Sequence, residues 1–541
     1  MAIGLLRPTS RYGFVVAGDV DERGVSSVMT VESPSTGPGR SSSDDPDRSR
    51  WLPTLTDQLN RPLSTPFCVL GWLASIGLFV ALVTLFGGPS LIDSQESTYS
   101  TWAIAHGEFS CAYPSVTRVG EPLVAPLYPL LAGSISAVTR IGHDLPFPSS
   151  SALGPGCRKG LVAMNDWFSH SGALRPTTWV GCATWLALMV GVIAWLRASG
   201  RGRRGWEPVT LFVVAALLPV WMCVQTYFHP QDLLALGLAL SALACARRDR
   251  WLMAGILLAL AILSQQFALL VAVPLFIVAP AAKKTRFAGA ALLAGAVVVL
   301  PLVVLTSGRV LRAVAIGSGS TPSSGRTVLW ETHISGFAGV LLYRVSPLVV
   351  AALLSWWVVR RIGPRALEPV PLMSLVAVSL ALRLVFEANL FTYYFMALMV
   401  TVVLLEATRG SIRRTVAAWI VAMTVVLCRM TGLPYLITEW KITLEHDVIP
   451  LLLGGAVVLG ILVEAIRGSD RRNLWPWIIV VALDLFTRLP GDNAFTSGRV
   501  IWFWQIALVV PGLLLAAQPL GDTIRTLGQQ DRHRLETLQS L

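Results

Sequence analysis

Charged residues are scarce in this chain. Only 14% of its 541 residues are Asp, Glu, Lys or Arg, whereas 54% are hydrophobic. Soluble proteins carry roughly 25% charged residues, so the composition excludes a soluble globular protein of this size. The alternating segments of an outer-membrane β-barrel are also missing. We therefore expect an all-α integral membrane protein, because a backbone in lipid must form its hydrogen bonds within its own helix.

Sequence motifs for common cofactors are absent as well. The chain has no Walker A loop, no Gly-x-Gly-x-x-Gly after a strand and no zinc-spaced set of Cys and His. We expect no nucleotide cofactor, and no motif supports a divalent metal. The net charge of +12 does not indicate nucleic acid, because most basic residues lie in short loops between apolar segments, as the positive-inside rule predicts.

Long apolar runs fill most of the sequence. A helix of about 20 apolar residues crosses the hydrocarbon core of a bilayer, and we predict about fourteen such spans. Their ranges are 67–86, 177–196, 207–226, 231–246, 251–264, 266–281, 287–306, 337–359, 367–384, 388–406, 415–430, 447–466, 473–490 and 499–518. The shorter apolar stretch 122–140 contains prolines and is predicted to lie on the membrane or to re-enter it.

The basic residues orient these spans. If the N-terminus is cytoplasmic, every inner connection carries at least three Lys or Arg, as at Arg247, Arg248 and Arg250, whereas the outer turns 225–230 and 264–266 carry none. We predict a multi-pass protein of the plasma membrane with both termini in the cytoplasm. Residues 1–62 form a disordered tail, residues 63–518 the membrane domain and residues 519–541 a second tail.

The predicted outer face collects the unusual polar residues. It includes a long first loop, residues 87–176, and six of the seven histidines. Cys111 and Cys157 are the cysteines of this loop. An oxidising exterior permits a disulfide between them, but spacing alone does not decide whether it forms.

Asp93 and Glu96 follow the first span directly and are the first candidates for chemistry. A carboxylate at the membrane surface can act as general base on an acceptor hydroxyl. The same Asp-x-x-Glu spacing resembles a capping box, which would serve only to bond the first turn of a helix over 94–106. The two roles do not exclude each other.

Further candidates lie at other outer turns. Pro230 and Asp232 suit the first turn of a helix, which leaves His229 without a structural reason and favours a phosphate-binding role. Gln265 and Gln266 are typical of a hairpin cap. Arg383, Arg429 and Arg488 are outer arginines that could bind a lipid phosphate or extend toward headgroups, and Arg383 could pair with Glu387. Asp484 within a span could pair with Arg488.

Three parts of the chain resemble the GT-C type of membrane glycosyltransferase, and most closely the bacterial mannosyltransferases that use polyprenyl-phosphate mannose. The parts are Asp93 to Glu108 with Tyr113-Pro114 and Pro126 to Pro129, then His229-Pro230-Gln231-Asp232 with Arg247 to Ala261, and lastly Tyr393-Tyr394. The likeness covers roughly residues 67–410.

This resemblance implies an inverting sugar transfer from a polyprenyl-phosphate donor to a lipid or glycan acceptor at the outer face. Mannose is expected before arabinose. Asp93 would be the base, with Glu96 as its rival, since both precede Tyr99. Many relatives have a lysine where this chain has Gln265-Gln266, so contact with the donor phosphate passes to His229 and Arg383. The remaining substrate-binding candidates are Tyr99, Tyr128 and Tyr393.

Two other classes of protein also fit the sequence. A transporter or flippase of a lipid-linked glycan would explain the number of spans and an acid within a span, and it predicts repeated halves with broken helices. A non-catalytic membrane scaffold would leave the polar outer face unexplained.

Overall fold

A computed structural model describes residues 55–86, 94–113, 125–141, 175–311, 341–387, 390–413 and 499–540, together with residues 88, 157, 338–339 and parts of 415–427. The described chain is helical and contains no β-strand. Five helical segments are long and apolar enough to cross a membrane, or six if one bent pair is counted as a single span. These segments define a helical membrane protein. The predicted spans 447–466 and 473–490 lie outside the described residues.

The five spanning segments are Thr65–Leu85, Thr178–Ala198, Ala281–Leu305, Leu341–Leu367 and Pro369–Phe386. They correspond to α2 (Thr65–Leu85), α8 (Arg175–Cys182) with α9 (Thr184–Ala198), α15 (Ala281–Leu305), α18 (Ser346–Ile362) with its flanking turns, and α19 (Pro369–Phe386). Each falls on a range predicted from its apolar run, because helix length in a membrane follows bilayer thickness.

One predicted span is broken. α10 (Trp206–Ala216) and α11 (Leu218–Gln225) meet at an angle of 51°. Pro219 lies in the first turn of α11. Proline lacks a backbone N–H and clashes with the carbonyl one turn before it, so the hydrogen bonds of α10 cannot continue through this point.

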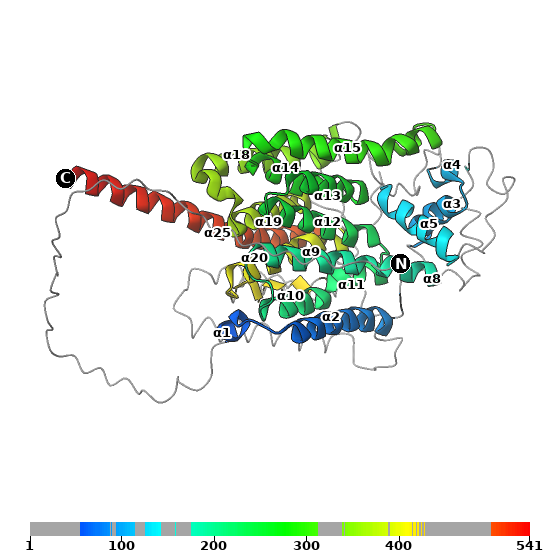
Figure 1. Ribbon diagram of the computed structural model, residues 1–541, viewed down its shortest axis with the longest axis horizontal. Coiled ribbons are helices and arrows are strands. Elements are labelled where there is room, and N and C mark those ends of the chain that lie inside the picture. The colour runs from blue at the N-terminus through cyan, green and yellow to red at the C-terminus, as the bar shows by residue number, and fades with distance from the viewer. Residues whose placement is uncertain are drawn as a thin grey trace, which may run out of the picture. The chain divides into compact units, whose positions relative to one another are not determined.

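Further helices complete the bundle. They are α12 (Pro230–Arg247), α13 (Trp251–Ser264), α14 (Leu269–Val278), α20 (Met396–Arg409) and the long α25 (Arg499–Ser540). α12 packs against α9 and α13, and α13 packs against α15, while α19 contacts α20 and α25 (Figure 1). α25 continues to Ser540 through the range that the sequence assigns to a C-terminal tail.

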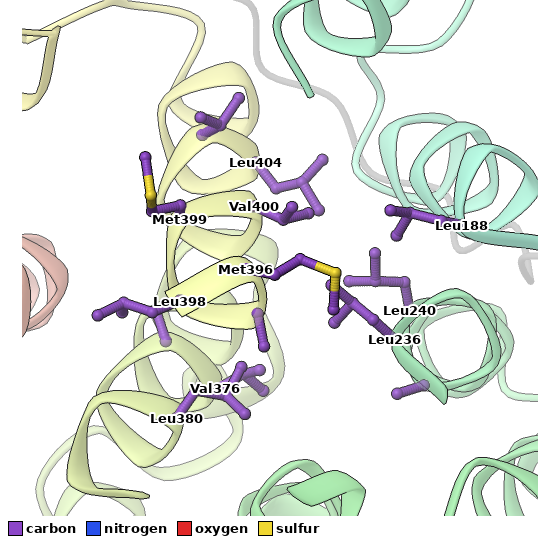
Figure 2. Packing of buried hydrophobic residues seen from close by; sticks show 14 of the residues in the cluster. Leu188, Leu236, Leu240, Val376, Leu380, Met396, Leu398, Met399, Val400 and Leu404 are labelled. Atoms are coloured by element: carbon purple, nitrogen blue, oxygen red, sulfur yellow. The ribbon is translucent and has the colours of Figure 1, made fainter. Parts of the chain in front are cut away.

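The packed core joins helices from both halves of the chain. Met396 of α20 points toward Leu236 and Leu240 of α12, and Leu188 of α9 lies beside them (Figure 2). All four side chains are buried. In lipid the hydrophobic effect does not drive helices together, so close packing and polar contacts hold such a bundle.

The backbones of α9 and α12 are in close contact. A Cβ atom added to Gly191 would lie 2.3 Å from the carbonyl oxygen of Gly237, and one added to Gly237 would lie 2.3 Å from that of Ala187. These two glycines therefore let the helices approach more closely than side chains would allow.

The basic connections meet at one end of the bundle, which we call the basic end. Polar contacts join segments that are distant in sequence, including α1 (Leu55–Asn60) from the predicted N-terminal tail. The contacts are Arg201 to Asn60 and to the carbonyls of Thr408 and Arg409, Arg247 to the carbonyl of Leu367, Lys283 to Asp249, and Arg197 to Glu207. The loops that the sequence assigns to one face of the membrane thus lie together.

The first long loop contains further helices. α3 (Ser94–Ala105) packs against α4 (Phe109–Ala112) and α5 (Leu127–Thr139), and a disulfide joins Cys111 to Cys157 with their Cα atoms 5.3 Å apart. α5 in turn contacts α12 and α13. The loop is therefore attached to the start of α12 and the end of α13.

Candidate functional site

Polar and aromatic side chains gather where α12 begins and α13 and α19 end. The set also includes the short helix η7 (Thr392–Phe395). We call it the polar cluster and define it as His229, Gln231, Asp232, Gln265, Arg383, Glu387, Tyr393 and Tyr394. Gln231, Asp232 and Glu387 are each at most 5% exposed. So many buried polar groups between helix ends are expensive unless they bond to each other or to a ligand.

His229 is positioned by the sharp turn between α11 and α12. Phe228 adopts the left-handed conformation, with φ of 41°. The backbone N–H of His229 donates to the carbonyl of Cys223 over 2.6 Å, and the thiol of Cys223 donates back to the carbonyl of His229. The imidazole stacks on the ring of Tyr393, with centroids 4.2 Å apart. Backbone and side chain together set the direction of the imidazole.

The protonation of His229 follows from these surroundings. Burial, with the nearby Arg383, lowers its pKa to about 4, so the ring is neutral at pH 7. Its Nδ1 accepts a hydrogen bond from Nε2 of Gln231 over 2.8 Å. A neutral imidazole that accepts at Nδ1 carries its proton on Nε2. His229 can therefore donate a hydrogen bond from Nε2.

Gln231 leaves one acceptor unused. Its Oε1 is buried and has no hydrogen-bond partner among the described residues. Buried carbonyl oxygens nearly always have a partner, and a ligand hydroxyl or a water could supply one. The backbone carbonyl of Gln231 is already satisfied by Ser264 Oγ at 2.8 Å.

Asp232 is held by a residue from the next turn. Its Oδ1 accepts from Nε2 of Gln265 over 2.6 Å, while Oε1 of Gln265 accepts from the backbone N–H of Gln266. Gln265 therefore acts as the predicted cap and also bonds Asp232 across the two helices. This contact ties the start of α12 to the end of α13.

Arg383 lies beside aromatic rings and a carboxylate. Its guanidinium sits 4.6 Å from the ring centre of Tyr394 and 5.3 Å from that of Phe267. Its Nε lies 3.5 Å from Oε2 of Glu387, one turn further along. The predicted pair with Glu387 is present, and the aromatic faces hold the cation without using its N–H donors.

The structure thus brings together four residues that the sequence singles out, namely His229, Gln265, Arg383 and Tyr393. Gln266 is adjacent to the cluster. Tyr128 lies elsewhere, in α5, where it packs in one apolar group with Leu234 and Leu263. Tyr99 is buried in α3, and burial with the nearby Glu108 raises its pKa, so the phenol stays neutral.

Some candidates cannot be placed in this way. Asp93, Arg429, Asp484 and Arg488 lie outside the described residues. Glu96 lies in the first turn of α3, and its side chain is not described.

Sequence reasoning missed other members of the site. A position at the start of a helix already explains Asp232, and no local pattern singles out Gln231. Arg344, which also contacts Glu387 at 3.5 Å, has no signal in the sequence because it lies within a predicted apolar span. Only packing brings it to Glu387.

The polar cluster provides donors for an anion and an acceptor for a hydroxyl, in a helical membrane protein. Within the part of the chain that the structure describes, no three His, Cys, Asp or Glu residues could hold a metal ion. No protein-family model and no curated protein matches the chain. The function must therefore be argued from the site.

Proposed function

We propose that this protein is a GT-C type membrane glycosyltransferase. It transfers a sugar, mannose before arabinose, from a polyprenyl-phosphate donor to a lipid or glycan acceptor at the outer face of the plasma membrane. The proposal includes about fourteen spans, with both termini in the cytoplasm. The observation that carries it is the polar cluster at the start of α12, at the other end of that helix from the basic residues 247–250.

The chemistry of the cluster suits such a donor. A sugar phosphodiester has oxyanion oxygens that accept hydrogen bonds and sugar hydroxyls that donate them. His229 Nε2–H and the guanidinium of Arg383 are donors for the phosphate, and the unpaired Oε1 of Gln231 is an acceptor for a hydroxyl. Aromatic rings beside them, including Tyr393 and Tyr394, offer an apolar surface for the prenyl chain or the sugar face.

Two observations support an outward-facing cluster. The basic connections share one end of the bundle, and such residues concentrate on the cytoplasmic side. The disulfide between Cys111 and Cys157 belongs to an oxidising compartment, and it lies in the loop that packs on the start of α12. Both observations support a position of the cluster on the outer side, where the proposed lipid-linked donor would be used.

The proposed base comes from the same loop. Asp93 immediately precedes α3, Glu96 lies in its first turn, and α3 packs against α5, which contacts α12 and α13. In the reaction, the carboxylate takes the proton of the acceptor hydroxyl, whose oxygen forms a bond to the anomeric carbon. The bond from that carbon to the phosphate oxygen breaks, and polyprenyl phosphate leaves with the electron pair.

The test uses the full chain in liposomes with radiolabelled polyprenyl-phosphate mannose and a lipid extract. We expect labelled product from the wild type and a loss of roughly a hundredfold or more in Asp93→Asn or Glu96→Gln, the range typical of a general base. Asp522→Asn on α25, a carboxylate outside the cluster, is the matched control. Equal product from the wild type and both acid variants would exclude the proposed base.

One observation favours a second function. The 51° break between α10 and α11 is the kind of broken helix that transporters use, so a transporter or flippase of a lipid-linked glycan is the alternative. Pro219 already accounts for this break. In the same liposomes, movement of the labelled lipid across the bilayer without any product would favour the transporter and contradict the transferase.

A further inference from the structure

Two arginines share one carboxylate at the edge of the polar cluster. Arg344 lies on a single π-helical turn, Leu341–Val345, directly before α18. Its NH1 is 3.5 Å from Oε2 of Glu387, the same oxygen that lies 3.5 Å from Nε of Arg383. Single π-helical turns are frequent at functional sites.

Both arginines keep most of their donors unused. Charge-assisted N–H···O bonds are usually about 2.7–2.9 Å long, so both contacts to Glu387 are loose. Among the described residues, Glu387 is the only hydrogen-bond or ion-pair partner of either guanidinium. The side chain of Arg344 is 38% exposed and that of Arg383 is 13% exposed. A ligand can therefore reach these donors without breaking a well-made ion pair.

The charges of the three residues leave an excess of one positive charge. The two guanidinium groups contribute two positive charges, and the carboxylate removes one. Asp232 also interacts electrostatically with Arg383. This interaction does not depend on the charge of Glu387, so it does not alter a comparison of proteins with and without that charge. The carboxylate thus halves the positive charge that a bound anion would meet.

We propose that Arg344, Arg383 and Glu387 form a binding site for a phosphate ester, in which Glu387 weakens the binding of a doubly charged ester more than that of a singly charged one. This inference rests on the proposed function, because the donor is a phosphodiester with one negative charge. The product is a monoester that is largely doubly charged at pH 7, since its second pKa is about 6.

The physical basis is the product of charges in Coulomb's law. Removing the Glu387 charge adds one positive charge to the site, and a dianion gains twice as much from it as a monoanion does. With Glu387 present, the preference for the doubly charged product is reduced. The carboxylate therefore helps the spent lipid phosphate to leave.

The experiment measures binding rather than transfer. Full-length protein in nanodiscs is titrated with farnesyl phosphate, with its methyl diester and with inorganic phosphate. The variants are Glu387→Gln, Arg344→Gln and Arg344→Lys. Arg361→Gln, which removes an arginine that stacks on Trp357 of α18, is the matched control. Arg344→Gln leaves the Arg383–Glu387 pair in place, so the fold should survive, and the thermal unfolding midpoint checks this.

We expect Arg344→Gln to weaken the binding of both lipid esters by roughly tenfold, as for the loss of a charged contact near the protein surface. Arg344→Lys keeps the positive charge and should recover part of this affinity. Glu387→Gln should raise the affinity ratio of monoester to diester by roughly three- to tenfold. Arg361→Gln should change neither. Inorganic phosphate that binds as tightly as the lipid esters would identify free phosphate, not a lipid headgroup, as the ligand of this site.

Two results would overturn the proposal. One is unchanged binding in a folded Arg344→Gln variant, and the other is an unchanged ester ratio in Glu387→Gln. If either result is found and the wild type still transfers sugar, the proposed function stands and this binding site is rejected. If the wild type and the variants bind the esters as expected but the wild type transfers no sugar, the binding site stands and the proposed function is rejected.

Discussion

Single residues at the start of α12 do more than end a helix. Pro230 suits the first turn because it needs no N–H donor partner there. His229, Gln231 and Asp232 instead contact side chains that belong to η7, α13 and one another. The partners Tyr393 and Gln265 come from elsewhere in the chain, so these two contacts could not be read from local sequence.

The depressed pKa of His229 makes a testable contribution to stability. In the unfolded chain the ring binds a proton below its ordinary pKa of about 6.5, whereas in the fold it stays neutral down to about 4. Stability should therefore fall as pH drops from about 6.5 to about 4, by at most about 3 kcal/mol. Thermal unfolding midpoints at pH 7.5 and pH 5, for the wild type and His229→Gln, measure this.

The wild type should lose more stability on acidification than the variant, which has no imidazole to protonate. Equal losses in the two proteins would mean that the pKa of His229 is near its ordinary value and that its ring is well solvated.

The bond between Gln265 and Asp232 gives a second prediction at this scale. Gln265→Leu removes the amide donor from a carboxylate that is 1% exposed. We expect a loss of about 1–3 kcal/mol in the free energy of unfolding, since a buried acceptor is left without its partner. Thermal or denaturant unfolding in detergent provides the measurement.

A double variant tests the same contact. Asp232→Leu combined with Gln265→Leu replaces both polar partners by apolar groups, which is less costly than removing one of them. The double variant should therefore be more stable than the sum of the two single losses predicts. Simple additivity would show that the two side chains do not interact.

At the scale of helices, hydropathy and proline explain most of what is observed. Apolar runs predict where the spanning helices lie, and Pro219 explains why α10 and α11 do not form one straight helix. The close contact of α9 and α12 is different. The sequence contains 45 glycines and does not distinguish Gly191 and Gly237 from the others. Only the packing of the helices shows that these two lie against a neighbouring backbone.

Gly237→Ala tests the contact between α9 and α12. The added methyl would lie 2.3 Å from the carbonyl oxygen of Ala187, so the helices must separate and lose packing on both sides. We expect the free energy of unfolding to fall by at least about 2 kcal/mol. The measurements are a lower thermal unfolding midpoint and a smaller monodisperse peak in size-exclusion chromatography.

Gly295→Ala is the matched control, because an added Cβ there meets no atom within 4 Å. Its effect should be neutral or a gain of up to about 1 kcal/mol from helix propensity. Similar behaviour of the two variants would show that α9 and α12 are not in close contact.

For the whole molecule, the basic end is the feature on which the proposed orientation in the membrane rests. Its contacts connect the turn after α9 to α1 and to the end of α20, and they join the start of α15 to the turn before α13. The alternation of basic connections along the sequence predicts that these loops share a side of the membrane, and the contacts bring them together as that pattern requires.

Cysteine labelling tests which side this is. In a background that retains Cys111 and Cys157 and lacks the other cysteines, Gln58→Cys on the exposed face of α1 and Leu311→Cys after α15 report on the two ends of the bundle. A membrane-impermeant maleimide added to intact cells should label Leu311→Cys and not Gln58→Cys, because the basic end faces the cytoplasm in the orientation that we propose.

Cys111 and Cys157 serve as an internal control in the same cells. Bonded to each other, they should react with the maleimide only after treatment with a reductant. Labelling of Gln58→Cys in intact cells, with Leu311→Cys protected, would reverse the proposed orientation and place the polar cluster inside.

The sequence alone determined that this is a helical membrane protein and where the spanning helices of the described residues lie. Long apolar runs need helices in a bilayer, and basic loops distribute by side, so both follow from local composition. It also pointed to His229, Arg383 and Tyr393 one by one. Only the tertiary structure decided that they form one cluster with Gln231 and Asp232, and that Arg344 shares Glu387 with Arg383. Such contacts depend on how helices pack, which no single segment specifies.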